Sequence, residues 1–216
     1  MTRTICVIGK AKLSVRADTI RLNVTMKGCN ADYGEAVRLS AEETSELRKC
    51  FASVGFDGDR LKTTSFSIDS KYESRRDAGG EYRQKFVGYE YRHSAYILFD
   101  ADNALLGRVL NALGRSGVMP EFRLEYTVKD KESVRERLLS MIVADARSKA
   151  KCLATAADAA LGDVVNINYN VSDDDIVIQP FERTMLCSKS VDNAAFDITP
   201  DDITVEDSVT VTFEIK

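Results

Sequence analysis

The sequence contains a single histidine, His93, the side chain best suited to general acid–base chemistry near neutral pH. One histidine excludes metal sites built from several imidazoles and the H-E-x-x-H pattern of zinc proteases. A catalytic base also needs an orienting partner and a cleft, and the neighbouring sequence indicates neither. We therefore expect His93 to be a half-buried strand residue that is hydrogen-bonded locally, rather than a general base or a pH switch.

Five cysteines could supply thiolates for nucleophilic or metal chemistry. Their number is odd and no two are spaced as C-x-x-C, so neither a disulfide framework nor a zinc or redox motif is indicated. Unpaired cysteines are typical of a reducing compartment. We expect small buried side chains, with the cysteine in the polar segment near residue 187 the most exposed. The five are Cys6, Cys29, Cys50, Cys152 and Cys187.

The sequence also lacks the common motifs for binding phosphate and for acyl transfer. It has no G-K-[ST] phosphate loop and no G-x-S-x-G nucleophile elbow. Asp173, Asp174 and Asp175 offer oxygen ligands for a hard cation, but they lack the spacing and the glycine of a calcium loop, so they indicate a charged turn. We therefore assign no catalytic residue, no cofactor and no metal ligand.

Tyrosines mixed with basic residues near residues 82–96 are the strongest surface candidates. Such a mixture can stack on nucleic-acid bases, form an oligomer or protein interface, or pack across neighbouring strands. The candidate interface residues are Tyr82, Tyr89, Tyr91, Arg92 and Tyr96.

The charge distribution argues against a nucleic-acid partner. The net charge is −4 at pH 7, and residues 172–207 hold ten acidic side chains against Arg183 and Lys189. An acidic segment repels phosphate backbones, so we predict no binding to nucleic acid. The segment itself is expected to be a solvated acidic insertion before the last strand, either ordered against the body or ordering on contact.

Alanines recur at steps of three or four in the stretch RSKAKCLATAADAALG (147–162) and just before it. This spacing places them on one face of a helix and lets another element approach closely. We expect the stripe to seat the helix tightly on a sheet or on the helix at 31–54, with a subunit seam as the alternative. The stripe consists of Ala146, Ala150, Ala154, Ala157 and Ala160.

Stretches with the two-residue hydrophobic period of strands alternate along the chain with stretches that have the 3.6-residue period of helices. These patterns predict the elements that position the candidate residues. Asn30 or Asp32, Asp102 and Asp130 can cap three helices, which Gly55, Gly117 and Gly162 end. Gly9 indicates a bend or bulge between the first two strands. Strands are predicted at about 4–8, 13–27, 61–73, 86–101, 120–128, 163–178 and 208–216, and helices at about 31–54, 103–117 and 131–160.

Alternation within the strand at 86–101 predicts its two faces. Tyr89, Tyr91 and His93 share one face with Val87, whereas Phe86 falls on the other. The charged stretch before this strand, centred on Gly79 and Gly80, is predicted to be a hairpin tip.

The pattern predicts an α+β fold of order ββαββαβαββ, with mostly antiparallel sheet and amphipathic helices packed on one face. We expect one domain over residues 1–216, divisible into two sub-lobes at about 1–72 and 86–170, with the acidic insertion at 172–207.

Several stretches of the sequence resemble the SIMPL-domain family. Its members are bacterial, periplasmic or cytoplasmic proteins similar to immunogenic proteins, and their shared domain has no known function. The resemblance covers about residues 4–170 and the last strand. It implies an α+β fold and self-assembly, and it carries over no catalytic residue. The stretches are ICVIGKAKLSVRADTIRLNVTM, ASVGF, LKTTSFSIDSKYE, FVGYEYRHSAYILF, DARSKAKCLATAADAALGDVVNINY and VTVTFEIK.

Relatives are often secreted, but the first thirty residues show no charged-then-apolar signal pattern, so we expect a cytoplasmic protein. No apolar run approaches the roughly 20 residues of a membrane-spanning helix. The leading hypothesis is a non-enzymatic, self-associating homo-oligomer that acts through its assembled surface. The alternatives are a module binding a small ligand or a protein partner, using the groove between helices and the 73–86 loop, and an uncharacterised enzyme.

Overall fold

A computed structural model describes residues 3–76, 82–169 and 200–216. Within these ranges the chain forms seven strands in two sheets and three α-helices, in the predicted order, which confirms the α+β class. The elements are β1 (Thr4–Val15), β2 (Thr19–Asn30), α1 (Tyr33–Ser53), η1 (Gly58–Arg60), β3 (Lys62–Arg76), β4 (Tyr82–Asp100), α2 (Asn103–Arg115), β5 (Glu121–Thr127), α3 (Lys131–Ala156), β6 (Leu161–Asn168) and β7 (Ile203–Ile215).

The elements form two compact units, each built on one sheet. The three-stranded unit has strand order β1-β7-β6 and contains α3, whereas the four-stranded unit has order β3-β4-β2-β5 and contains α1 and α2. The first and last strands pair antiparallel along their whole length, from Thr4 with Glu214 to Val15 with Ile203. These units therefore do not coincide with sub-lobes at about 1–72 and 86–170, because pairing between the two chain ends leaves no local pattern.

Strand β1 runs unbroken through Gly9, so the predicted bend or bulge there is wrong. The break between the first two strands falls at residues 16–18 instead. A Cβ atom added at Gly9 would overlap the Ile142 carbonyl oxygen and lie 2.8 Å from the Ala146 Cβ. The glycine therefore permits close approach of α3 to the sheet.

The alanine stripe confirms this packing from the helix side. Ala146, Ala150 and Ala154 are fully buried, and α3 packs on β1 and β7. The stripe therefore seats α3 on its sheet and not on the helix at 31–54. The last two alanines, Ala157 and Ala160, are exposed and follow the helix.

Helix α3 also protects the outer edge of β1. The Asp145 carboxylate accepts a hydrogen bond from the Lys10 backbone N–H at 2.8 Å, and Lys149 donates to the Ile8 carbonyl at 3.2 Å. Asp145 and Lys149 pair with each other at 2.5 Å. Backbone groups that could otherwise pair with another strand are thereby occupied.

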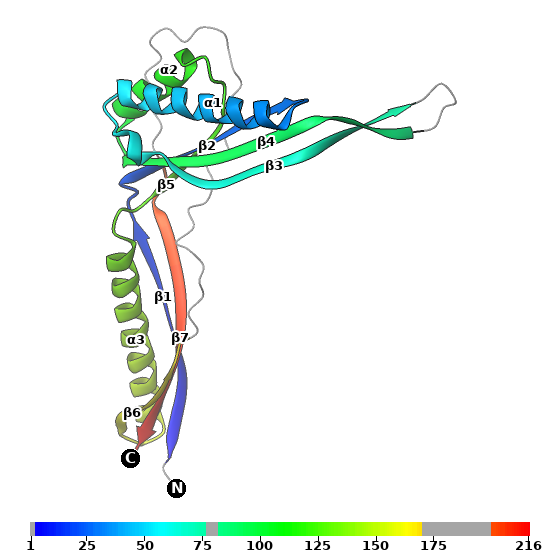
Figure 1. The fold of residues 1–216 in the computed structure, drawn as a ribbon. Coiled ribbons are helices and arrows are strands. Elements are labelled where there is room, and N and C mark those ends of the chain that lie inside the picture. The colour runs from blue at the N-terminus through cyan, green and yellow to red at the C-terminus, as the bar shows by residue number, and fades with distance from the viewer. Residues whose placement is uncertain (1–2, 77–81, 170–199) are drawn as a thin grey trace. The chain divides into compact units, whose positions relative to one another are not determined.

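In the four-stranded unit, α1 lies over β2 and β4, and α2 lies beside α1 on the same face of the sheet (Figure 1). Leu22, Ile97, Leu47 and Phe51 are among the side chains buried between α1 and the sheet. Tyr33 and Val37, predicted on the same apolar stripe as Leu47, are 54% and 39% exposed. The beginning of α1 is therefore only partly covered.

Helix starts follow the predicted caps more closely than helix ends do. Asp32, Asp102 and Asp130 each accept a backbone N–H in the first turn of a helix. The end predicted for α3 at Gly162 is wrong, because the helix stops at Ala156 and Asp158 takes a left-handed φ of 51°. Asn and Asp tolerate that conformation better than other non-glycine residues.

Strand β7 begins at Ile203, earlier than the predicted position 208. Glu206 and Asp207 from the acidic segment are thus strand residues, and Glu206 pairs with Lys12 across to β1. The remainder of that segment up to residue 199, including Cys187 and the aspartates at 173–175, lies outside the described residues.

Candidate functional site

Strands β3 and β4 continue past the N-terminal end of α1 as a two-stranded ribbon (Figure 1). Strand β2 makes its last pair with β4 at Asn30 and Tyr89. Beyond that point, β4 pairs only with β3 within the described part of the chain. We call the paired segments Lys71–Arg76 and Tyr82–Gly88 the arm.

A bulge at the base of the arm changes which residues of β4 share a face. The register shifts between Lys71, which lies opposite Gly88, and Tyr72, which lies opposite Phe86. Gly88 has φ of 152°, and a Cβ atom there would overlap the Asn30 carbonyl oxygen. Only glycine accommodates both the backbone conformation and the close approach.

Because of this extra residue, Phe86 lies on the same face as Tyr89, and the alternation-based assignment of Phe86 to the opposite face is wrong. Their ring centroids are 5.3 Å apart, which confirms the common face. Phe86 also contacts Tyr72 at 5.6 Å, and Tyr89 contacts Tyr33 of α1 at 5.4 Å. Four rings from three elements therefore form one continuous row.

Residues directly opposite in an antiparallel pair share a face, so the register divides the arm and its base into two unlike faces. Between Ser70 and Ser74 of β3, one face carries only uncharged side chains and the other is charged; farther out, Arg76 pairs with Tyr82 and so takes a register position on the first side. We call the uncharged set the arm face; it consists of the pairs Ser70–Tyr89, Tyr72–Phe86 and Ser74–Gln84. The opposite face carries Asp69, Lys71, Glu73, Arg75, Arg83, Lys85 and Glu90.

The arm face continues the side of the sheet that α1 covers elsewhere. Tyr91 and His93, next along β4, are buried beneath α1, whereas Tyr72 and Phe86 are 55% and 42% exposed. The apolar surface of the core therefore extends beyond its helical cover. Tyr82 is the outermost described residue of β4, lies opposite Arg76 in the backbone register and is 73% exposed. The hairpin tip predicted at Gly79 and Gly80 lies outside the described residues.

The structure separates the five candidate interface residues. Tyr82 and Tyr89 lie on the side of the arm face. Tyr91 is 2% exposed, so it cannot belong to a surface patch, and this part of the prediction is wrong. Arg92 and Tyr96 lie on the other side of β4, where the Arg21 guanidinium stacks on the Tyr96 ring at 4.1 Å.

Three aromatic residues of the row, Tyr33, Tyr72 and Phe86, were missed at the sequence level. Tyr33 was assigned to the buried stripe of a helix, and Phe86 to the wrong face of β4. The Gly88 position, in a strand interior, was the available signal, because such a glycine often marks a bulge. Allowing one extra residue there would have aligned Phe86 with Tyr89.

Tyr91 has a structural role beneath α1. Its ring packs against Gly28, where an added Cβ atom would come within 2.5 Å of the ring. Burial, followed by a hydrogen bond to Glu43, raises the pKa of the Tyr91 phenol far above its usual range. The phenol therefore stays protonated and holds α1 to the sheet.

His93 is enclosed by two threonine hydroxyls, as predicted for a locally bonded strand residue. Thr44 Oγ1 lies 2.9 Å from Nδ1, and Thr63 Oγ1 lies 2.9 Å from Nε2. Thr44 already donates its hydroxyl proton to the Ser40 carbonyl at 2.7 Å, so it accepts from Nδ1–H. Nε2 then accepts from Thr63, which assigns a neutral ring protonated at Nδ1.

Burial, with a smaller effect of the Arg48 charge, lowers the pKa of His93 below its usual 6.5. At this residue the unfolded chain therefore binds a proton more readily than the native chain, so the contribution of His93 to stability is largest above about pH 6.5 and falls as the pH decreases below it. We expect His93→Gln to reduce this loss. Urea unfolding of both proteins at pH 7.5 and 5.5 checks it, and equal losses in both would contradict the assignment.

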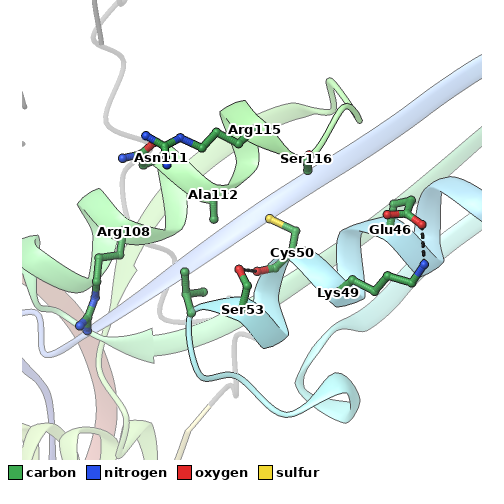
Figure 2. Close-up of a pocket in the computed structure, with 10 residues that line it drawn as sticks. Glu46, Lys49, Cys50, Ser53, Arg108, Asn111, Ala112, Arg115 and Ser116 are labelled. Carbon is green, nitrogen blue, oxygen red and sulfur yellow. Dashed lines mark hydrogen bonds and ion pairs between the residues drawn. The ribbon is translucent and has the colours of Figure 1, made fainter. Parts of the chain in front are cut away.

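A groove of about 630 Å³ lies between the C-terminal halves of α1 and α2 (Figure 2). Cys50 and Ala112 line it, while the side chains of Arg108 and Arg115 extend away from Cys50 (Figure 2). Burial raises the pKa of the Cys50 thiol, which disfavours the reactive thiolate. The groove thus has volume for a ligand but no converging set of polar groups at its floor.

Within residues 3–76, 82–169 and 200–216, no cluster of three or more potential metal ligands occurs. Cys6, Cys29, Cys50 and Cys152 are free thiols, and of these only Cys50 is buried, so the expectation of buried side chains is wrong for the other three. No helix in the same ranges has the length and apolar character needed to cross a membrane.

Comparison with known proteins gives one match that spans nearly the whole chain. A family model described as "SIMPL: Protein of unknown function (DUF541)" matches residues 5–213. Among solved structures, the chain is similar to CutA from Synechococcus elongatus PCC7942, with 16% identity over 61% of this chain and 96% of that one. The TM-score of 0.22 is too low to support an inference. No curated protein matches the chain.

Proposed function

The chain belongs to the SIMPL family of proteins of unknown function, and we propose that it acts without catalysis, as a self-associating protein whose contact surface is the arm face. The observation that carries this proposal is the continuation of the core side of the four-stranded sheet beyond its helical cover, with Tyr72 and Phe86 about half exposed. A two-stranded ribbon alone is marginally stable in water. A covering partner would stabilise it.

The composition of the arm face favours a second copy as that partner. Interface centres are depleted in charged residues and enriched in aromatic ones, and tyrosine with serine is a common binding pair. Hydroxyl and amide groups such as those of Ser74 and Gln84 both donate and accept hydrogen bonds. A face of this kind complements a copy of itself without repulsion, as a two-fold interface requires.

The division of the arm into two faces supports a protein partner over nucleic acid. Binding of single strands combines stacked aromatic rings with basic groups that reach the phosphates of the same strand. Here Arg83 and Lys85 lie on the face opposite Tyr72 and Phe86. These two positive charges therefore lie on the face away from the Tyr72 and Phe86 rings.

The expected interface is small. An aromatic side chain buries about 150–250 Å² when fully covered, so four rings exposed by 42–73%, together with the partly exposed Tyr89, offer roughly 500 Å² per copy. A total near 1,000 Å² is at the lower limit for a specific interface, so we expect a reversible dimer with a dissociation constant of the order of micromolar. The five rings are Tyr33, Tyr72, Tyr82, Phe86 and Tyr89.

The two side chains best suited by type to catalysis support the non-enzymatic part of the proposal. The His93 ring is held between two hydroxyls as a neutral group, and the Cys50 thiol has a raised pKa. Neither is prepared for proton transfer or nucleophilic attack. The free thiols at Cys6 and Cys29, both exposed, further favour a reducing compartment such as the cytoplasm.

Binding of a small ligand in the groove between α1 and α2 is the second candidate function. The volume of about 630 Å³ lies within the range of ligand sites. Thermal-shift screening with small organic anions and neutral metabolite-like compounds would test it, since a bound ligand raises the unfolding temperature.

The self-association proposal is tested by Phe86→Ser, with Lys85→Ser as the matched control. Phe86 lies in the middle of the aromatic row, and Lys85 is its neighbour on the charged face. Losing one ring from each copy should weaken the dimer by about 10-fold or more, whereas the control should change the dissociation constant by less than about 3-fold. Size exclusion with light scattering measures both.

Equal weakening by the two variants would contradict a contact through the arm face. Circular dichroism of both variants controls for folding, because neither side chain is buried in the core.

A further inference from the structure

We propose that two copies pack arm face to arm face, with the arms antiparallel about a two-fold axis that passes between Gln84 and Phe86. This inference rests on the proposed self-association and specifies its geometry. The alternative geometry pairs the open backbone edges of two β4 strands side by side. The two geometries bury different side chains, so they can be told apart.

Burial of apolar surface favours face-to-face packing. Edge pairing of two arms would form a wider sheet and leave Tyr72 and Phe86 in water on one side. Face-to-face packing removes both rings from water, which is the dominant favourable contribution to association. Packed sheets are separated by about 10 Å, which side chains of this size fill.

The position of α1 selects the antiparallel arrangement. The helix begins at Tyr33 and lies on the same side of the sheet as the arm face, immediately beyond its base. If two arms packed parallel, their α1 helices would compete for the same layer above the two sheets. In the antiparallel arrangement, the partner arm lies over this arm, in the same layer in which α1 lies over the rest of the sheet.

The antiparallel arrangement also accounts for two exposed tyrosines. Residues 82–89 span about 24 Å at the usual rise of a strand. The tip of the partner arm would therefore point towards the N-terminal turn of α1. Tyr82, 73% exposed near the tip, would cover Tyr33, 54% exposed at that turn.

The midpoint of the arm face identifies the position where the two copies meet. Along β4 the residues on this side are Tyr82, Gln84, Phe86 and, after the bulge, Tyr89. The midpoint falls between Gln84 and Phe86. The two Gln84 side chains then point towards each other diagonally across the axis, from sheets about 10 Å apart.

A charge-swap experiment at Gln84 tests this geometry. Gln84→Glu alone and Gln84→Lys alone each place two like charges across the axis, so each variant should dimerise at least about 10-fold more weakly than the unmodified chain. An equal mixture of the two variants should recover a heterodimer within about 3-fold of the unmodified affinity. Sedimentation velocity of the separate and mixed proteins, with one variant fluorescently labelled, measures both. Lys85→Glu is the control on the charged face.

Each other outcome has a defined meaning. If both Gln84 variants dimerise as tightly as the unmodified chain while Phe86→Ser does not, the geometry is wrong and self-association through the arm stands. If both variants are monomeric and their mixture stays monomeric, the two-fold contact at Gln84 is wrong. If the unmodified chain is itself monomeric, the proposed function fails together with this inference.

Discussion

A Gly88→Val variant should lose both the arm and the ability to self-associate. The added side chain would overlap the Asn30 carbonyl oxygen, and φ of 152° is unfavourable for a β-branched residue. The clashing atoms belong to the backbone of Asn30 and Ala31, so they cannot rotate away as the end of a side chain could. We expect the free energy of unfolding to fall by about 3 kcal/mol.

The loss of self-association follows from the bulge. Without the bulge beside Gly88, in which Val87 is the extra residue, Phe86 would turn to the charged face and the aromatic row would be broken. Gly58→Val is the matched control, since an added Cβ atom there meets nothing within 4 Å. Urea unfolding and light scattering of the two variants make the comparison, and similar results for both would contradict the role assigned to the bulge.

A Gly9→Val variant should destabilise the three-stranded unit by a similar or larger amount. The new side chain would overlap the Ile142 carbonyl oxygen of α3, and a backbone atom cannot be displaced without moving the helix. We expect a loss of about 3 kcal/mol or more, equivalent to a decrease of about 10 °C in the unfolding temperature for a chain of this size.

Cys6→Val provides the control for Gly9→Val, because Cys6 is exposed on the opposite face of the same strand. Its unfolding temperature should stay within about 2 °C of the unmodified value, as expected for an exposed strand position. Circular dichroism during heating gives both values. An unchanged unfolding temperature for Gly9→Val would show that α3 does not seat on β1 at this residue.

Local signals in the sequence were sufficient for the element order and the helix starts. Asp32, Asp102 and Asp130 cap the three helices because their carboxylates accept backbone N–H groups, an interaction that depends on a few neighbouring residues. The alanine spacing likewise predicted a closely packed helix face. Each of these features depends only on residues within one or two helical turns of one another.

Features set by distant residues were not predictable in this way. Gly9 was interpreted as a bend, because the sequence does not show that Ile142 and Ala146 lie above it. The division into units depends on pairing of β1 with β7, which lies almost two hundred residues further along the chain. Such pairings are determined by the packing of the whole unit rather than by local preference.

The candidate site depends on both local and distant residues. Tyrosines between 82 and 96 predict an aromatic surface on β4, but regular alternation could not separate the exposed Tyr82 from the buried Tyr91. Helix α1, which covers Tyr91, begins at Tyr33, so the part of β4 before Tyr89 extends beyond this cover. Only the relative positions of helix and strand show which rings are left exposed.

The most direct test of self-association is the molar mass of the unmodified chain as a function of concentration. Sedimentation equilibrium between about 1 and 100 µM spans the affinity expected of a small interface. We predict that the mean mass rises from the monomer value of 24.0 kDa towards twice that value. A mass that stays at 24.0 kDa throughout this range would contradict the account.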